Sequence, residues 1–64
     1  MSAKIVFSGG GEVVVSEDPD VVLEILIKDK RARTSFSKLS DGSGHQVHIA
    51  PEQVAFVGPA SYGS

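Results

Sequence analysis

The sequence predicts a small α+β fold: a small antiparallel β-sheet or partly open barrel with one helix, in the order β-β-α-β-β-β. Three observations support this prediction. Apolar, β-branched segments alternate with turns near both ends of the chain, a helix-capping sequence precedes a long apolar segment in the middle, and 64 residues suffice for only one domain. We expect a single domain over residues 1–59, followed by a flexible C-terminal tail at 60–64.

The first predicted element is a β-hairpin. Residues 4–7 (KIVF) and 12–15 (EVVV) are rich in β-branched and aromatic side chains, and the glycines at 9–11 separate them. Because glycine adopts turn conformations at no steric cost, this pattern predicts two strands joined by a turn. A phosphate-binding loop is not expected, because such a loop leads into a helix and here a strand follows.

A helix is predicted next. Asp18 can cap it, and Pro19 suits the first helical position. The helix should run from Pro19 to about Lys30. A buried strand is the competing prediction for this segment, because valine and isoleucine also favour extended structure.

The predicted helix is unusually apolar. Asp20, Glu24 and Lys28 recur every four residues and form one narrow polar stripe, while apolar residues occupy the rest of the circumference. One small sheet cannot cover that much apolar surface, so we expect the excess to be buried against a second copy or another protein. The residues expected at this interface are Val21, Val22, Leu23, Ile25, Leu26 and Ile27.

Three strands should follow the helix. Residues 34–39 and 46–49 predict a second hairpin around a turn at 41–44, with Val47 and Ile49 facing inward.

Residues 53–57 predict the fifth strand, which Gly58–Pro59 should end. The three phenylalanines, Phe7, Phe36 and Phe56, are expected mostly inside the fold.

Candidate catalytic and metal-binding residues are few. His45 and His48 stand three positions apart on a predicted strand, so they point to opposite faces and cannot hold one ion together. We expect His45 to be half-buried and His48 exposed. The segment 42–45 (GSGH) resembles a nucleophile elbow only superficially and is better explained as a turn. We therefore expect no catalytic activity, no metal and no cofactor.

The charge distribution offers an alternative function. The net charge is −2, with acids concentrated before residue 28 and bases after it. Acids at the start of a helix and bases at its end complement the helix dipole, which explains most of this pattern. The alternative is a nucleic-acid- or anion-binding regulatory module that uses the basic segment 28–33. Its contacting residues would be Lys28, Lys30, Arg31 and Arg33.

Composition limits the cellular setting. The chain has no cysteine, which excludes a disulfide-built fold and indicates a reducing compartment. No apolar run reaches the ~18 residues that a membrane span needs, and Met1–Lys4 leads into strand-like sequence with no readable secretory signal. We expect a cytoplasmic protein that binds no membrane and no evident small-molecule substrate. A core this small without disulfides or metals favours a homo-oligomer or a protein partner.

Two parts of the chain resemble the small FlbD-like proteins of flagellar gene clusters. Residues 36–42 (FSKLSDG) and 47–54 (VHIAPEQV) are similar to that family's Thr-Arg-Leu-Asn-Gly turn and following strand, and residues 5–17 are similar to its closing hairpin and helix start. Here the two parts stand in reverse order, Ser43–Gly44 is inserted, and Lys38 replaces the family's arginine. The resemblance implies a β-rich, helix-bearing binding or regulatory module without a catalytic residue.

Overall fold

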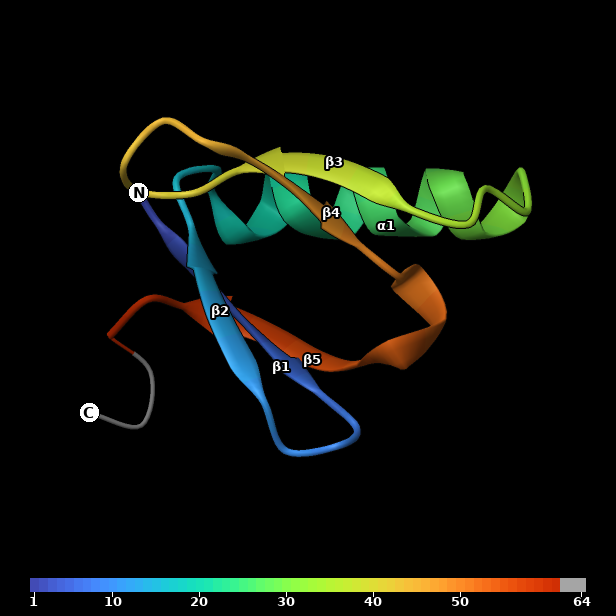
Figure 1. Ribbon diagram of the computed structural model, residues 1–64, viewed down its shortest axis with the longest axis horizontal. Helices are drawn as coiled ribbons and strands as arrows, with labels where there is room; N and C mark the ends of the chain where they lie inside the picture. Colours follow the sequence, from blue (N-terminus) through green and yellow to red (C-terminus); the bar gives the residue numbers. More distant parts are fainter. Residues whose placement is uncertain (62–64) are drawn as a thin grey trace.

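The computed structural model describes residues 1–61, in which one helix packs against two small antiparallel sheets (Figure 1). The α+β class and the order of strands and helix are confirmed. Of the predicted tail, residues 62–64 lie outside the described residues, and the Ala60 N–H donates to the Ser2 carbonyl oxygen at 3.1 Å. The elements are β1 (Ala3–Phe7), β2 (Glu12–Val15), α1 (Pro19–Arg31), β3 (Ser37–Ser40), β4 (Gln46–Ile49), the 3-10 helix η1 (Pro51–Gln53) and β5 (Val54–Pro59).

The five strands form two open sheets, one of three strands in the order β2-β1-β5 and one of two strands, β3-β4. In Figure 1 the β3–β4 hairpin lies across α1, and the three-stranded sheet lies below them. The sheets meet where Val15 bridges Asp41 and the Ser16 N–H donates to the Ser40 carbonyl oxygen at 2.7 Å. The hairpin of residues 3–15 is thereby tied directly to the end of β3.

The core lies between α1 and the inner faces of both sheets. Each of α1 and β1 to β4 contributes one or two buried apolar side chains, and η1 contributes Pro51, as expected for a small core built from alternating strand positions and one helix face. Ser37 is the one polar residue buried with them, and its hydroxyl has no hydrogen-bond partner among the described residues. The buried apolar residues are Ala3, Ile5, Val15, Val22, Leu26, Leu39 and Ile49.

The helix prediction is confirmed, and the competing strand prediction is wrong. Pro19 begins α1, where its missing N–H is not needed. The Asp18 backbone is extended and its carbonyl oxygen accepts the Val22 N–H at 2.9 Å. Asp18 is the N-cap residue, as predicted, but its side chain makes no capping hydrogen bond, because that carboxylate pairs with the N-terminal amine of Met1.

The helix ends in a left-handed turn at Arg33. The Thr34 N–H donates to the Asp29 carbonyl oxygen at 2.9 Å and the Arg33 N–H to that of Lys30 at 3.1 Å, which is the hydrogen-bond pattern of a Schellman motif. Arg33 has a φ of 59°, a conformation that costs a non-glycine residue about 1 kcal/mol or more. Glycine is the usual residue at this position, so an arginine here lowers the stability of the helix end.

Two strand boundaries differ from the prediction. β3 begins at Ser37 rather than Thr34, because the turn that closes the helix occupies the residues up to Thr34. β5 continues through Gly58 and Pro59, which pair with Lys4 and Ala3 of β1. Proline is tolerated there because β5 is an edge strand of its sheet, where a missing N–H need not interrupt a ladder.

Two of the three phenylalanines expected inside are exposed. Phe36 is 57% exposed; it lies just before β3, outside the strand, whose inward residues are Ser37 and Leu39. Phe56 is 46% exposed because it pairs with Val6, on the sheet face turned away from the core. The third is half-buried against the core.

In β4, the inward orientation of Val47 and Ile49 is confirmed, Val47 being half-buried and Ile49 buried. His48 is exposed, as the alternation predicts. The prediction that His45 is half-buried is wrong. This residue precedes β4 and belongs to the turn, so the parity of the strand does not apply to it.

Candidate protein-interaction surface

The apolar residues of α1 divide into a buried set and an exposed set. Val22 and Leu26 are buried in the chain's own core, and Ile25 is half-buried against it. Folding of the chain therefore already buries these three side chains wholly or partly, and a partner could contact little of them. The exposed residues are Leu23 (43% exposed), Ile27 (52% exposed) and Val21 (41% exposed).

Leu23 and Ile27 lie one turn apart on the same side of α1, and we call them the Leu23–Ile27 stripe. They form one wall of a shallow groove of about 190 Å³, whose opposite wall comes from β5 and includes Val54 and Val57. Leu26 also lines this groove. A strip of apolar surface therefore runs from the helix across to the edge strand. Val21 lies about a third of a turn around the helix from Ile27 and does not line the groove.

Ile27 stands between two hollows. Besides the groove toward β5, it lines a larger, open depression of about 770 Å³ along the second half of the helix, together with Glu24, Lys28 and Arg31. A side chain that borders both hollows and is half exposed forms a ridge between them. Exposed apolar ridges beside hollows are the surface features through which proteins commonly dock on one another.

The exposed charges of α1 change sign along the helix. Asp20 and Glu24 lie in its first half, and Lys28, Lys30 and Arg31 lie in its second half. None of these five forms an ion pair with another of the residues described, 1–61. The Leu23–Ile27 stripe is therefore bordered by acids toward one end and by bases toward the other, all exposed to solvent.

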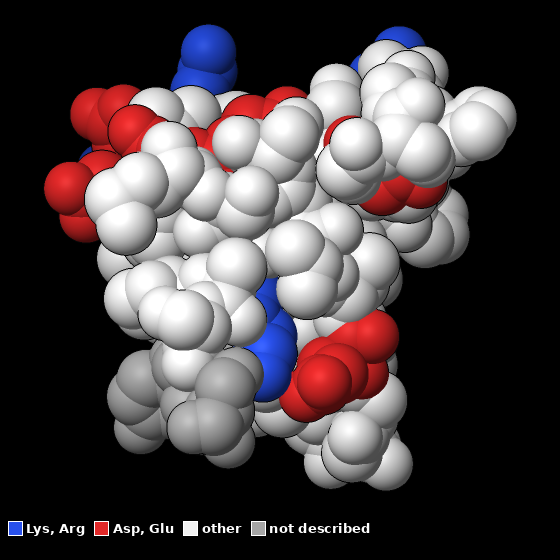
Figure 2. Space-filling model, turned by 90° about the vertical axis from the view of Figure 1, so that its left-hand side faces the viewer, with Lys and Arg blue, Asp and Glu red and all other residues white. Residues whose placement is uncertain are grey.

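Acidic side chains gather where the helix begins. Figure 2 looks at the left-hand side of Figure 1, which holds the start of α1 and the β3–β4 turn, and red groups crowd the upper part of that face. Glu17, Asp18, Asp20 and Asp41 belong to these two segments. The basic end of α1 lies about 20 Å away, the length of a helix of 13 residues. The chain is thus strongly polarised along its helix.

The four basic residues of the alternative prediction do not form one patch. Lys28 and Arg31 line the 770 Å³ depression, whereas Lys30 and Arg33 line a separate hollow of about 460 Å³. All four are exposed. The helix thus divides the basic segment between two sides of the molecule, because neighbouring residues of a helix point in different directions.

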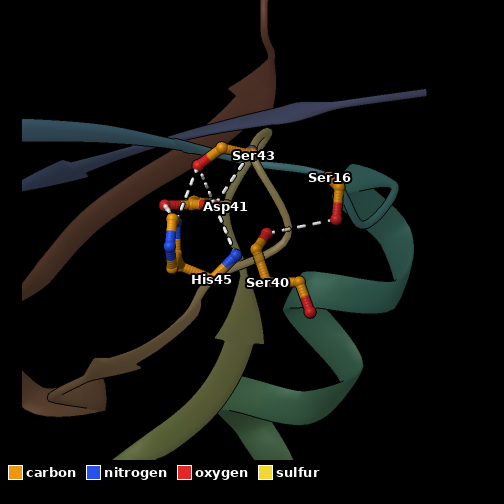
Figure 3. Close-up of polar contacts among 5 residues, drawn as sticks. All are labelled: Ser16, Ser40, Asp41, Ser43 and His45. Carbon is orange, nitrogen blue, oxygen red and sulfur yellow. Dashed lines mark hydrogen bonds and ion pairs between the residues drawn. The ribbon is translucent and has the colours of Figure 1, made fainter.

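The turn between β3 and β4 is organised around the Asp41 carboxylate (Figure 3). Its Oδ1 accepts hydrogen bonds from the Ser43 N–H, the Ser43 hydroxyl and the His45 N–H, all at 2.9 Å. The Ser43 hydroxyl and the His45 N–H are the main causes that lower the pKa of Asp41 below its usual value. Gly44 has a φ of 88°, which only glycine adopts easily. These residues build a hydrogen-bonded turn.

The same three side chains do not form a catalytic triad. The Ser43 hydroxyl lies 3.0 Å from Nδ1 of His45, and Asp41 Oδ2 lies 3.9 Å from that same nitrogen. A triad requires the serine and the carboxylate on opposite nitrogens of the imidazole, so that the carboxylate orients the ring while the other nitrogen takes the proton. The arrangement agrees with the turn that the sequence predicts.

No protein-family model matches the chain, and no curated protein matches it in sequence. Its function is therefore inferred from the geometry of its surfaces. No helix within residues 1–61 is both long and apolar enough to cross a membrane. Across the same residues, no three His, Cys, Asp or Glu side chains lie close enough together to hold a metal ion.

The sequence prediction identified the helix side of this surface and missed the rest. Val54 and Val57 form the opposite wall only because β5 returns to pair with β1, a contact between distant parts of the chain. The sign change along the helix, with Asp20 near its start, is readable from the sequence, but the groove beside it is not. The structure also removes Val22 and Leu26 from the surface available to a partner.

Proposed function

We propose that this protein is a non-catalytic assembly module that associates with itself through the Leu23–Ile27 stripe. The observation that supports the proposal most directly is the exposure of two large aliphatic side chains, one turn apart, beside an apolar groove. Burying the exposed half of each side chain should stabilise a complex by about 1 kcal/mol, roughly half of the value for a fully exposed aliphatic side chain. Without disulfides, a core of this size gains most from such burial.

Analytical ultracentrifugation tests this proposal. The wild-type protein should associate at micromolar concentrations, and Ile27→Asp should be monomeric, because a carboxylate at the centre of the stripe would have to be desolvated in the complex. Val21→Asp is the matched control: it places the same charge on the same helix at similar exposure but away from the groove. It should associate as the wild type does.

The outcome that contradicts the proposal is equally simple. A wild-type protein that is folded by circular dichroism and remains monomeric up to high micromolar concentrations does not assemble through this surface. Equal losses of association in Ile27→Asp and Val21→Asp would place the interface elsewhere on the helix.

A second candidate function is anion or nucleic-acid binding by Lys30 and Arg33. Both line the 460 Å³ hollow, together with the potential hydrogen-bond donors Thr34 and Ser35. Arg33 also has a left-handed backbone conformation, which glycine would adopt without strain. Strained residues of this kind cluster at functional sites. Glu52 lines the same hollow and opposes an anion, so we rank this candidate second.

Arg33→Gly tests this candidate, because its effects on folding and on binding have opposite signs. Removing the strained side chain should raise the free energy of unfolding by about 1 kcal/mol. If the hollow binds phosphates, the same change should weaken binding of a fluorescent single-stranded oligonucleotide at low salt, measured by anisotropy. An oligonucleotide that fails to bind the wild type under these conditions excludes the candidate.

A further inference from the structure

The charges that border the Leu23–Ile27 stripe indicate how two copies would meet. We infer that the stripes of two copies pack with their α1 helices antiparallel about a two-fold axis, and that Asp20 of each copy pairs with Arg31 of the other. The inference rests on the proposed function and adds to it the geometry of the complex and the residues that determine it.

A two-fold interface brings the same surface of both copies together, so that surface must complement itself. Parallel helices would set the acidic first half of one α1 against the acidic first half of the other, and base against base. Antiparallel helices set the acidic half with Asp20 and Glu24 against the basic half with Lys28 and Arg31. Antiparallel packing also places the positive end of each helix dipole beside the negative end of the other.

The spacing of residues gives the register of this packing. If the two-fold axis passes midway between Leu23 and Ile27, Leu23 of each copy contacts Ile27 of the other. Asp20 lies about one turn before Leu23, and Arg31 lies about one turn after Ile27. Both charges are therefore at similar distances from the axis, and both lie on the solvent-facing flank of the stripe. Symmetry then produces the Asp20–Arg31 pair twice.

The same arrangement gives the outer rim a matching pattern. Glu24 and Lys28 lie further around the helix from the groove, one turn apart, and antiparallel packing brings Glu24 of each copy toward Lys28 of the other. All of these groups are exposed and lack an ion-pair partner within residues 1–61. A second copy can therefore engage them without breaking an existing pair.

Charge reversal with a mixing step tests the geometry. Asp20→Arg gives a chain with bases at both ends of the stripe, and Arg31→Asp gives a chain with acids at both ends. Each variant alone should self-associate about tenfold more weakly than the wild type, because two attractive pairs become repulsive at about 0.2–1 kcal/mol for each pair lost. An equimolar mixture should associate as well as the wild type, because both pairs are then attractive again, one in its original orientation and one reversed.

The controls separate geometry from folding and from the proposed function. Lys38→Glu, an exposed reversal on β3 away from the stripe, should leave association unchanged. Circular dichroism should show that each variant retains the helix. For the wild type itself, raising the salt from about 0.05 M to about 0.5 M should weaken association, because exposed pairs are screened. This measurement does not depend on any variant folding.

Each contrary outcome has one meaning. If the wild type associates but both reversal variants associate equally well, or if salt does not weaken association, the antiparallel arrangement is wrong while assembly through the stripe stands. If the mixture remains as weak as its components, Asp20 and Arg31 do not face each other. If the wild type itself is monomeric, the proposed function fails, and the geometry fails with it.

Discussion

The two sides of α1 carry the same kinds of residue and differ in what covers them. Leu26 is 6% exposed because it packs in the core, whereas Leu23, less than one turn away, is 43% exposed beside the groove. Val22 and Ile27 show the same contrast between a buried and an exposed aliphatic side chain. The apolar residues of this helix therefore have two separate roles: some form the core of the chain, and others form an exposed surface. Substitutions on each side of the helix can distinguish the two roles.

The largest expected effect comes from truncating the same residue type on each side. Leu26→Ala should lower the free energy of unfolding by about 2–5 kcal/mol, because it removes buried contacts and leaves a cavity. Leu23→Ala should cost less than about 1 kcal/mol, because its side chain is already partly hydrated. Urea unfolding followed by circular dichroism measures both, in an Ile27→Asp background so that association does not contribute. If both variants lost similar amounts of unfolding free energy, the two sides of the helix would not differ in burial as described.

A smaller effect is expected at the polar atom on the buried side. Ser37 is fully buried and its hydroxyl lacks a partner within the described chain, so Ser37→Ala should raise the free energy of unfolding by about 1 kcal/mol. The contrasting variant is Ser16→Ala, whose exposed hydroxyl donates to the Ser40 carbonyl oxygen at 3.1 Å. It should leave stability unchanged or lower it by about 0.5 kcal/mol. Thermal unfolding of both variants checks the opposite signs, and a destabilised Ser37→Ala would show that the hydroxyl has a partner.

The smallest effect concerns the turn at Asp41, most of whose residues are exposed. Its hydrogen bonds from Ser43 and His45 lower the pKa of the carboxyl, so the turn is stabilised at neutral pH and loses that stabilisation as the pH falls through the lowered pKa. The Ser43 and His45 amide proton shifts, followed by NMR, should titrate with a midpoint below the usual range of aspartate. Asp41→Asn should abolish that transition. A midpoint at the ordinary aspartate value would mean that the three hydrogen bonds do not persist in solution.

The local elements of the fold could be predicted because their signals are local. The glycines between two β-branched segments predicted the first hairpin, and Pro19 together with the period-four polar residues predicted the helix over a strand. Alternation likewise placed Ile49 inside. The boundaries failed where two signals overlapped: the helix-closing turn at Arg33 delays the start of β3, and the edge position of β5 allows Pro59 to remain paired.

The division of the strands into two sheets and the candidate surface could be predicted only in part, because both depend on contacts between distant residues. Nothing in the spacing of residues 54–59 shows that they pair with β1, and without that pairing the groove beside Leu23 has no second wall. For the same reason the composition of the helix predicted an excess of apolar surface without showing which residues form it. Phe56 illustrates the limit: its residue type suggested burial, but its register with Val6 turns it outward.

The central position of β1 also has a consequence for the order in which the molecule folds. β1 pairs on one side with β2, which follows within a few residues, and on the other with β5, so that Ala3 contacts Val15 and Pro59. Closing the second pairing requires nearly the whole described chain to loop back, which slows folding because the entropy of a long loop is lost before the contact forms. During synthesis, the first hairpin and the helix emerge well before β5. Until β5 is synthesised, one edge of β1 and the side of α1 that packs against β5 are exposed to other chains. Aggregation is therefore most favoured during this interval.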